Sequence, residues 1–127
     1  MKTKEINVLM VKPYERPVMT TIKNDLDGLQ EAVGGLIEIV DLSETACVLC
    51  NEEGKLIGLA GNRTFYNDIL VGTFYVCGMD HCGNLISLSD EDIKKYTKQF
   101  WEPEYFTQEE IDDSIVFEFI DPETMSK

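Results

Sequence analysis

The sequence lacks long apolar runs, and this shortage excludes a class of protein. No stretch approaches the ~20 consecutive apolar residues that a membrane-spanning helix needs. The N-terminal stretch MKTKEINVLMVKP has no small-residue cleavage site after its short apolar part, so we expect no secretory signal peptide. The sequence therefore predicts a protein of the cytoplasm, in a host cell, that does not contact a membrane.

Basic residues are also scarce. The 127 residues include 11 Lys or Arg and 24 Asp or Glu, which gives a formal net charge of -13 and a pI near 4.3. Such a surface repels phosphate backbones, so we expect no direct binding of nucleic acid and favour a protein partner with a basic, nucleic-acid-binding surface. The excess of acidic residues is not spread evenly along the chain, because residues 99–127 hold nine acids and one base.

Motifs that would reveal catalysis or a cofactor are missing. The sequence contains no glycine-rich phosphate loop, no HExxH, no GxSxG and no EF-hand loop. The lone His81 stands beside Cys82 in a polar turn, where a Cys-His pair would lack the orienting third group that nucleophilic catalysis requires. We therefore favour a non-catalytic protein without a cofactor. An acid pair that only the fold brings together leaves an enzyme open.

The length of 127 residues and the 43% of hydrophobic residues are typical of one globular domain. Apolar and β-branched runs predict strands, and caps with helical spacing predict helices over residues 26–35, where Gly34 and Gly35 supply the stop, and over residues 89–100. The predicted strands cover residues 6–11, 18–22, 36–40, 46–50, 55–58, 69–77, 84–88 and 114–120. Residues 59–68 are expected to form a loop. This pattern predicts an α+β fold: a mostly antiparallel sheet of five to seven strands with two main helices packed on one face.

The four cysteines allow two interpretations. CVLC at 47–50 and CGMDHC at 77–82 supply the count of a zinc site, formed by Cys47, Cys50, Cys77 and Cys82. However, Val48 and Leu49 continue a strand pattern, and residues three apart on a strand point to opposite faces, so Cys47 and Cys50 could not share an ion. We favour no metal, with Cys47, Cys50 and Cys77 as buried thiols and Cys82 exposed in a turn.

Four segments in order carry a family resemblance: LQEAVGGLIEIV, CNEEGKLIGLAGNR, DILVGTFYVCG and NLISLSDEDIKKY. Over about residues 5–105 they resemble domain-of-unknown-function family 3846, which is found on phages, plasmids and conjugative elements of Firmicutes and related gut bacteria. The resemblance implies an accessory protein of a mobile element without an assigned reaction. It also divides the chain into a family-like domain at 1–105 and an acidic C-terminal extension at 106–127, packed on that domain or trailing from it.

Five polar positions are carried over from the family motifs: Asn51, Glu52, Glu53, Asn62 and Arg63. Asn51 also has an interpretation as a turn former. In a chain with few bases, Arg63 could grip a carboxylate or a phosphate in bidentate fashion. It could equally form a salt bridge with Glu52 or Glu53.

Two functions follow as hypotheses. The first is binding of a host or phage macromolecule through an acidic surface, in the manner of anti-restriction or anti-CRISPR inhibitors that imitate DNA. The carboxylates for this role run from Glu102 to Glu123 and include Glu109, Glu110, Asp112 and Asp113, although such a tail could also serve only solubility. The second is binding of a small, nucleotide-like ligand by the Asn62-Arg63 loop and the NEEG turn, which predicts a pocket containing Arg63.

Overall fold

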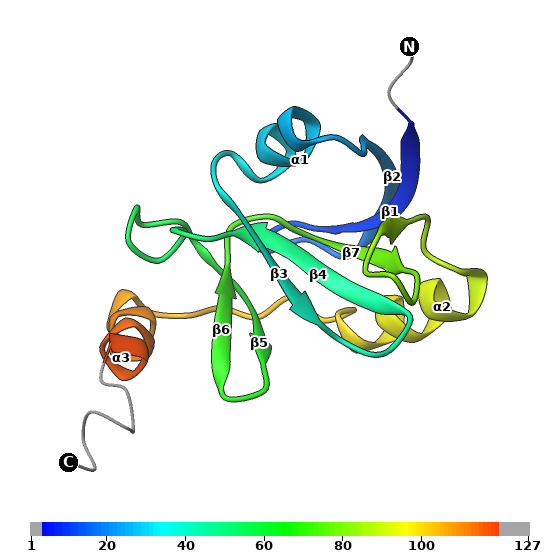
Figure 1. Ribbon diagram of the computed structural model, residues 1–127. Helices are drawn as coiled ribbons and strands as arrows, with labels where there is room; N and C mark the ends of the chain where they lie inside the picture. Colours follow the sequence, from blue (N-terminus) through cyan, green and yellow to red (C-terminus); the bar gives the residue numbers. More distant parts are fainter. Residues whose placement is uncertain (1–3, 120–127) are drawn as a thin grey trace, which may run out of the picture.

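The computed structural model describes residues 4–119, with side chains described for residues 4–113 (Figure 1). The elements, in chain order, are β1 (Glu5–Val11), β2 (Val18–Lys23), α1 (Leu26–Val33), β3 (Ile37–Asp41), β4 (Ala46–Asn51), β5 (Gly61–Phe65), β6 (Asp68–Val71), β7 (Phe74–Met79), β8 (Leu85–Ile86), α2 (Asp90–Gln99) and α3 (Gln108–Phe119). No helix in this part of the chain combines the length and the apolar character needed to cross a membrane.

The main sheet has six strands, all joined in antiparallel pairs. Its strand order is β2-β1-β7-β4-β3, with β8 paired to β7 off this path. Strands β5 and β6 form a separate two-stranded sheet. The predicted α+β class and the mostly antiparallel sheet of five to seven strands are thus confirmed.

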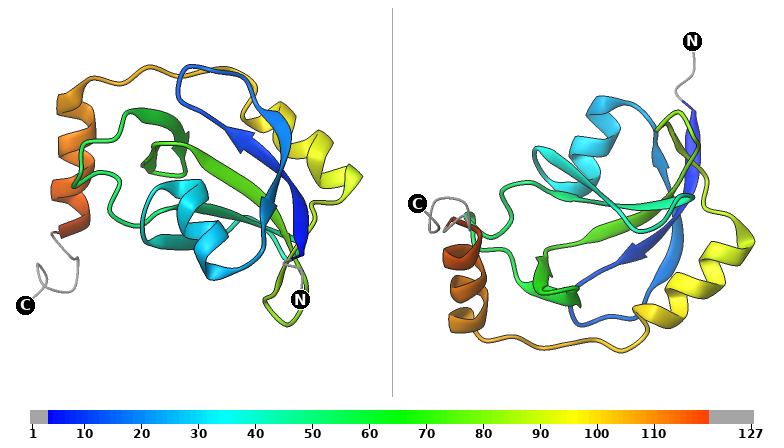
Figure 2. Two further views of the ribbon diagram at one scale, coloured as in Figure 1. Left: turned by 90° about the horizontal axis from the view of Figure 1, so that it is seen from above. Right: turned by 60° about the horizontal axis from the view of Figure 1, so that its bottom comes forward.

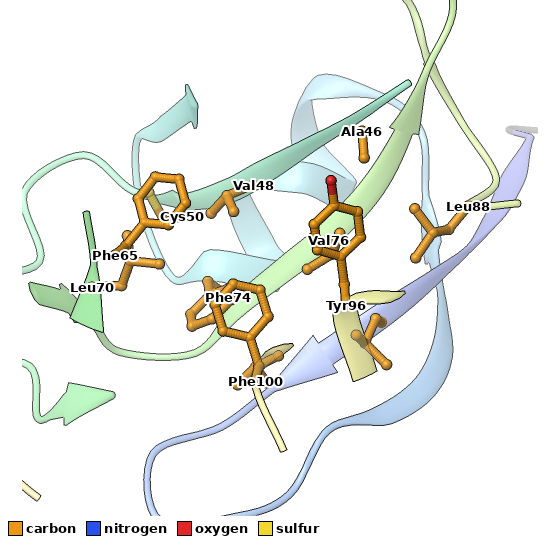
Figure 3. Packing of buried hydrophobic residues seen from close by; sticks show 12 residues of the cluster. Ala46, Val48, Cys50, Phe65, Leu70, Phe74, Val76, Leu88, Tyr96 and Phe100 are labelled. Atoms are coloured by element: carbon orange, nitrogen blue, oxygen red, sulfur yellow. The ribbon is translucent and has the colours of Figure 1, made fainter. Parts of the chain in front are cut away.

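The central strands β4 and β7 are buried along almost their whole length, so both faces of the sheet must be covered. On one face, Val48 and Val76 pack with Tyr96 of α2, with Phe100 just after this helix, and with the β5–β6 hairpin (Figure 3). Phe74 and Phe100 meet edge to face there, with ring centroids 5.2 Å apart.

The opposite face is covered by α1. Leu29 and Val33 of this helix pack with Cys47, Leu49 and the other inward residues of the second cluster. The two main helices therefore lie on opposite faces of the sheet (Figure 2), and the prediction that they share one face is wrong. The reason is that strands apolar at every position need a cover on each side, and one helix is available for each.

The helix starts follow the capping signals. Asp25 caps α1 by accepting from the amide of Gly28 at 2.7 Å, and Ser89 caps α2 by accepting from the amide of Asp92 at 3.2 Å. Gly34 ends α1 in the left-handed region, with φ +77°. These contacts confirm the two predicted helices.

Three local predictions are wrong. Residues 55–58 form turns, and no strand follows the NEEG turn there. Residues 59–68 contain strand β5, which the pattern hides because two of its buried residues are polar. Residues 69–77 are divided into β6 and β7 by Gly72 at φ +71°, where a Cβ would lie 2.6 Å from Leu59 Cδ1.

The C-terminal prediction also changes. The strand expected over 114–120 is a continuation of helix α3 as far as Phe119, and residue 120 lies outside the described residues. A capping box begins this helix: Thr107 Oγ1 accepts from the amide of Glu110 at 3.1 Å, and Glu110 Oε1 accepts from the amide of Thr107 at 2.8 Å. Once a helix is nucleated, each further residue adds to it at little cost, so the apolar run SIVFEF extends it.

Candidate functional site

Asn62 and Arg63 are buried on strand β5, with 0% and 1% of their surface exposed. The Arg63 guanidinium donates to three backbone carbonyls: Nε to Phe100 O at 3.0 Å, Nη1 to Asn62 O at 3.2 Å and Nη2 to Glu15 O at 2.5 Å. Nη1 also donates to Asn62 Oδ1 at 2.8 Å. Arg63 therefore links the loop at 12–17 to the end of α2 through hydrogen bonds inside the protein.

The electrostatic surroundings of Arg63 fit this internal role. Burial lowers the pKa of Arg63, while the nearby Glu104 and Tyr105 raise it. Within the described residues Arg63 forms no salt bridge, so the expected ion pair with Glu52 or Glu53 is not formed. Its charge is compensated mainly by carbonyl dipoles in the protein interior.

Asn51 shapes the NEEG turn from inside. It is 7% exposed, its Nδ2 donates to Val33 O at 3.1 Å, and its Oδ1 accepts from the amide of Glu53 at 2.8 Å. This is the geometry that the turn-former interpretation predicts. Glu52 and Glu53, by contrast, are exposed.

A pocket of about 260 Å³ opens between this turn and strand β6. Its charged residues are Glu38, Glu52, Lys55 and Asp68, and its lining also includes Cys50 and apolar residues of β6. Lys55 forms a salt bridge with Asp68. Three carboxylates against one ammonium make the pocket net negative. Its lining includes the NEEG turn but not Arg63, so the two halves of the predicted ligand site do not meet.

The Cys50 thiol lines this pocket, and its surroundings favour the protonated form. It lies on β4 directly opposite Glu38, and its Sγ is 3.7 Å from Glu38 O. Burial, then Glu38 and Asp68, raise the pKa of Cys50 to about 12, while Lys55 lowers it. A thiol in this state is a poor nucleophile and a poor metal ligand.

The other cysteines lie apart from Cys50. Cys47 and Cys77 face each other across β4 and β7 in the cluster under α1, whereas Cys50 belongs to the opposite cluster. Burial raises the pKa of Cys47 to about 11, with help from Asp41. Cys82 is exposed, as predicted. Within residues 4–113, no group of three or more His, Cys, Asp or Glu side chains is placed to hold a metal ion.

The carboxylates at the start of α3 are exposed. Glu109, Glu110, Asp112 and Asp113 all face solvent, whereas Ile111 between them is 4% exposed and packs inward. Glu110 is partly engaged in the capping box, and Asp112 accepts from Gln108 Nε2 at 2.9 Å. The side chain of residue 118 and residues 121 and 123, which belong to the same predicted acidic set, lie outside the described part.

The segment between α2 and α3 is held against the β5–β6 hairpin. Glu104 accepts from Thr64 twice, from the amide at 3.1 Å and from the hydroxyl at 2.6 Å. Phe106 packs so closely on Gly61 that a Cβ there would lie 2.7 Å from its ring. These contacts place α3 beside β6 and the NEEG turn, as the views in Figures 1 and 2 show.

The result is a concentration of acid at one end of the molecule, which we call the acidic end. It consists of the start of β3, the turn at 51–56, β6 and the first turns of α3, and its carboxylates are Glu38, Glu52, Glu53, Asp68, Glu109, Glu110, Asp112 and Asp113. Lys55 is the one base in these segments, and it is paired with Asp68. The sequence showed the α3 acids, but Glu38 and Asp68 join them only through strand pairing, for which no local signal exists.

The fold and this end define a small α+β domain with a carboxylate-lined recess. The chain belongs to the family described as Domain of unknown function (DUF3846), whose model matches residues 6–101. The match ends just after α2, so α3 lies beyond it. No curated protein and no solved structure matches the chain.

Proposed function

We propose that this protein is a non-catalytic accessory protein that binds a basic host or phage macromolecule through the acidic end. The partner is a protein whose basic surface normally holds nucleic acid, and the encounter takes place in the host cytoplasm. A phage or another mobile element is the setting that the family resemblance implies. Inhibition of a host defence, as by anti-CRISPR or anti-restriction proteins, is the outcome that such competition would produce.

The observation that carries this proposal is the imbalance at the acidic end. Eight carboxylates stand against one ammonium group, and that ammonium is already paired with Asp68. An excess of like charges on neighbouring segments raises a negative potential that attracts a basic surface and speeds its association. The start of α3, which carries four of these acids, is also held in position, because a capping box begins the helix and Ile111 packs inward.

The pocket adds a specific element to this charge. A recess of about 260 Å³ bordered by Glu38, Glu52 and Asp68 has room for the end of one Lys or Arg side chain. A cation there would be partly desolvated between carboxylates, which makes its contacts stronger than those on an open surface. The exposed acids of α3 would steer the partner, and the pocket would fix its position.

The geometry favours this function over binding of a nucleotide. The cation expected to hold a phosphate, Arg63, is buried and donates to backbone carbonyls. The pocket that does form is net negative, so it would repel a phosphate.

The test compares two triple variants with the same change in net charge. One neutralises the acidic end with Glu109→Gln, Asp112→Asn and Asp113→Asn, which spares the capping residue Glu110. The matched control neutralises exposed acids on other elements with Asp27→Asn, Glu44→Gln and Glu91→Gln. Each chain, with the intact protein, is used to capture partners from host lysate at low and high salt.

We expect the intact protein and the control to capture the same basic protein, and the acidic-end variant to lose it. Capture should weaken steeply with salt, because the attraction is between exposed charges. The purified partner should then release a labelled DNA duplex when the intact protein is added. Equal capture by all three chains, or a partner that keeps its DNA, would overturn the proposal.

A further inference from the structure

The two edge strands of the main sheet differ in how far they are protected against pairing with another strand. Strand β3, at one edge, carries the charged residues Glu38 and Asp41. Strand β2, at the other edge, pairs with β1 alone among the described residues and has no charged side chain from Val18 to Ile22. Proteins normally blunt a free edge with charge or proline, because its backbone groups are a template for another strand. Along β2 such groups stand only at the ends, with Pro17 just before the strand and Lys23 as its last residue, so the stretch between them is not protected in this way.

Hollows lie beside β2 on both faces of the sheet. Helix α1 lies over one of these faces and α2 over the other (Figure 2). The α1 hollow, of about 360 Å³, is bordered by Ile22, Glu31, Ala32 and Tyr75, together with Glu5 and Lys23. The α2 hollow, of about 340 Å³, is bordered by Met19, Leu88, Asp90 and Ile93. An edge strand between two recesses is the arrangement used when a peptide is bound by strand addition.

We propose that β2 binds an extended segment of another protein as an added strand of the main sheet. The backbone of the segment pairs with the outward N–H and C=O groups of β2, which supplies affinity without regard to sequence. Successive side chains of a strand point to opposite faces, so alternate residues of the segment would enter the two hollows. This surface is separate from the acidic end and does not depend on it.

The linings of the hollows specify the side chains that fit. The α2 hollow combines the apolar Met19, Leu88 and Ile93 with one carboxylate, Asp90, and with polar residues of β1 and β2, and its apolar part accepts an apolar side chain. The α1 hollow contains two carboxylates, Glu5 and Glu31, against the one ammonium of Lys23, so it favours a basic side chain. The occupant is therefore an extended segment in which an apolar residue alternates with Lys or Arg.

A second copy of this chain fits less well. Two copies paired about the centre of β2 would bring Val18 of one chain near the α1 hollow of the other, where the carboxylates favour a cation. Two chains that each carry -13 also repel each other.

The test is a titration of the isotope-labelled full chain with a synthetic peptide of about eight residues that alternates Lys with Val or Leu, the length of a typical strand. A control peptide has the same composition with its lysines and its apolar residues in separate blocks. Met19→Arg places a bulky cation at the α2 hollow, and Ile39→Arg makes the same change at an exposed site on the opposite edge strand. Amide shifts and hydrogen exchange report where each peptide binds.

We expect saturable shifts centred on β2, slower exchange of its amides, and binding at least about tenfold weaker in M19R than in I39R. The block peptide should leave β2 unchanged. Shifts at the acidic end with none at β2, equal effects of the two peptides on β2, or concentration-dependent dimers that M19R abolishes would each overturn the inference. The block peptide carries the same positive charge as the alternating peptide, and the acidic end attracts both. A failure of binding at β2 is therefore distinguishable from a failure of the proposed function.

Discussion

Arg63 on β5 donates from Nε to the backbone carbonyl of Phe100 at the end of α2, over 3.0 Å. Its other end reaches Glu15 O in the loop at 12–17, so one side chain joins three parts of the chain. Around this contact, Tyr14 stacks on Tyr105 and Arg16 lies 4.6 Å from the ring of Trp101. The sequence indicated Arg63 as a possible ligand-binding residue. In the structure it instead holds these parts of the chain together.

Replacing Arg63 with Met should destabilise the protein by about 3 kcal/mol, because several buried carbonyls would lose their charged donor. Arg63→Lys should also destabilise, since an ammonium group cannot reach carbonyls on opposite sides at once. Urea unfolding measures both. Arg16→Lys, at an exposed arginine nearby, is the control and should change stability by less than about 0.5 kcal/mol. Unchanged stability of R63M would show that Arg63 does not hold these segments together.

Gly72 connects β6 to β7 under two constraints, its φ of +71° and the close approach of Leu59. Gly72→Ala should therefore destabilise by about 2–3 kcal/mol, through backbone strain and a steric clash together. Gly34 has a similar φ of +77°, but a Cβ added there would meet nothing within 4 Å, so Gly34→Ala should lose only about 1 kcal/mol. Thermal or urea unfolding of the two variants separates the clash from the strain, and equal losses would refute the role of Leu59.

The capping box of α3 should control the order of the acidic end. Thr107→Ala removes the hydroxyl that accepts from the Glu110 amide, and should weaken the helix start by about 1 kcal/mol. Hydrogen exchange of the first α3 amides should then become faster while exchange in the main sheet stays unchanged. Thr107→Ser keeps the hydroxyl and is the control. Equal exchange in the two variants would show that the helix is held by other contacts.

Buried thiols should make the protein less stable in alkali. The pKa of Cys47 is raised from 9.0 to about 11, and that of Cys50 from 9.0 to about 12, so the folded state keeps protons that the unfolded state releases. This contribution is complete below pH 9 and is lost as the pH rises toward the folded values, at up to about 1.4 kcal/mol per pH unit for each thiol. The free energy of unfolding should fall between pH 9 and 11.

The matched variants assign this pH dependence. Cys50→Ala should reduce the slope above pH 9, although it will also leave a small cavity that lowers stability at every pH. Cys82→Ala changes an exposed thiol and should leave the slope as it is. A slope that is the same in both variants would show that Cys50 does not carry the effect.

Much of the local structure could be predicted because local chemistry determines it. The apolar runs give β1, β4 and β7, and the caps at Asp25 and Ser89 give α1 and α2. Strand β5 could not be predicted, because Asn62 and Arg63 are buried polar residues whose partners lie at Val11, Gly72, Glu15 and Phe100. A pattern of hydrophobicity does not record such partners.

The candidate site divides in the same way. The exposed acids of α3 are visible as a charge excess in the sequence, but their neighbours Glu38 and Asp68 come from β3 and β6, which are far from them in the chain. The pocket exists only because β3 pairs with β4 and the NEEG turn folds over β6. Nothing in the spacing of these residues indicates that pairing.

The sequence by itself determined the net charge, the burial of three cysteines and the positions of the main helices, since each depends on residue type or on neighbours a few positions away. Only the tertiary structure decided that α1 and α2 cover opposite faces, that Arg63 points inward and that the acids of four segments share one end. Those features depend on contacts between distant residues, which form when both faces of a sheet with buried central strands are removed from water.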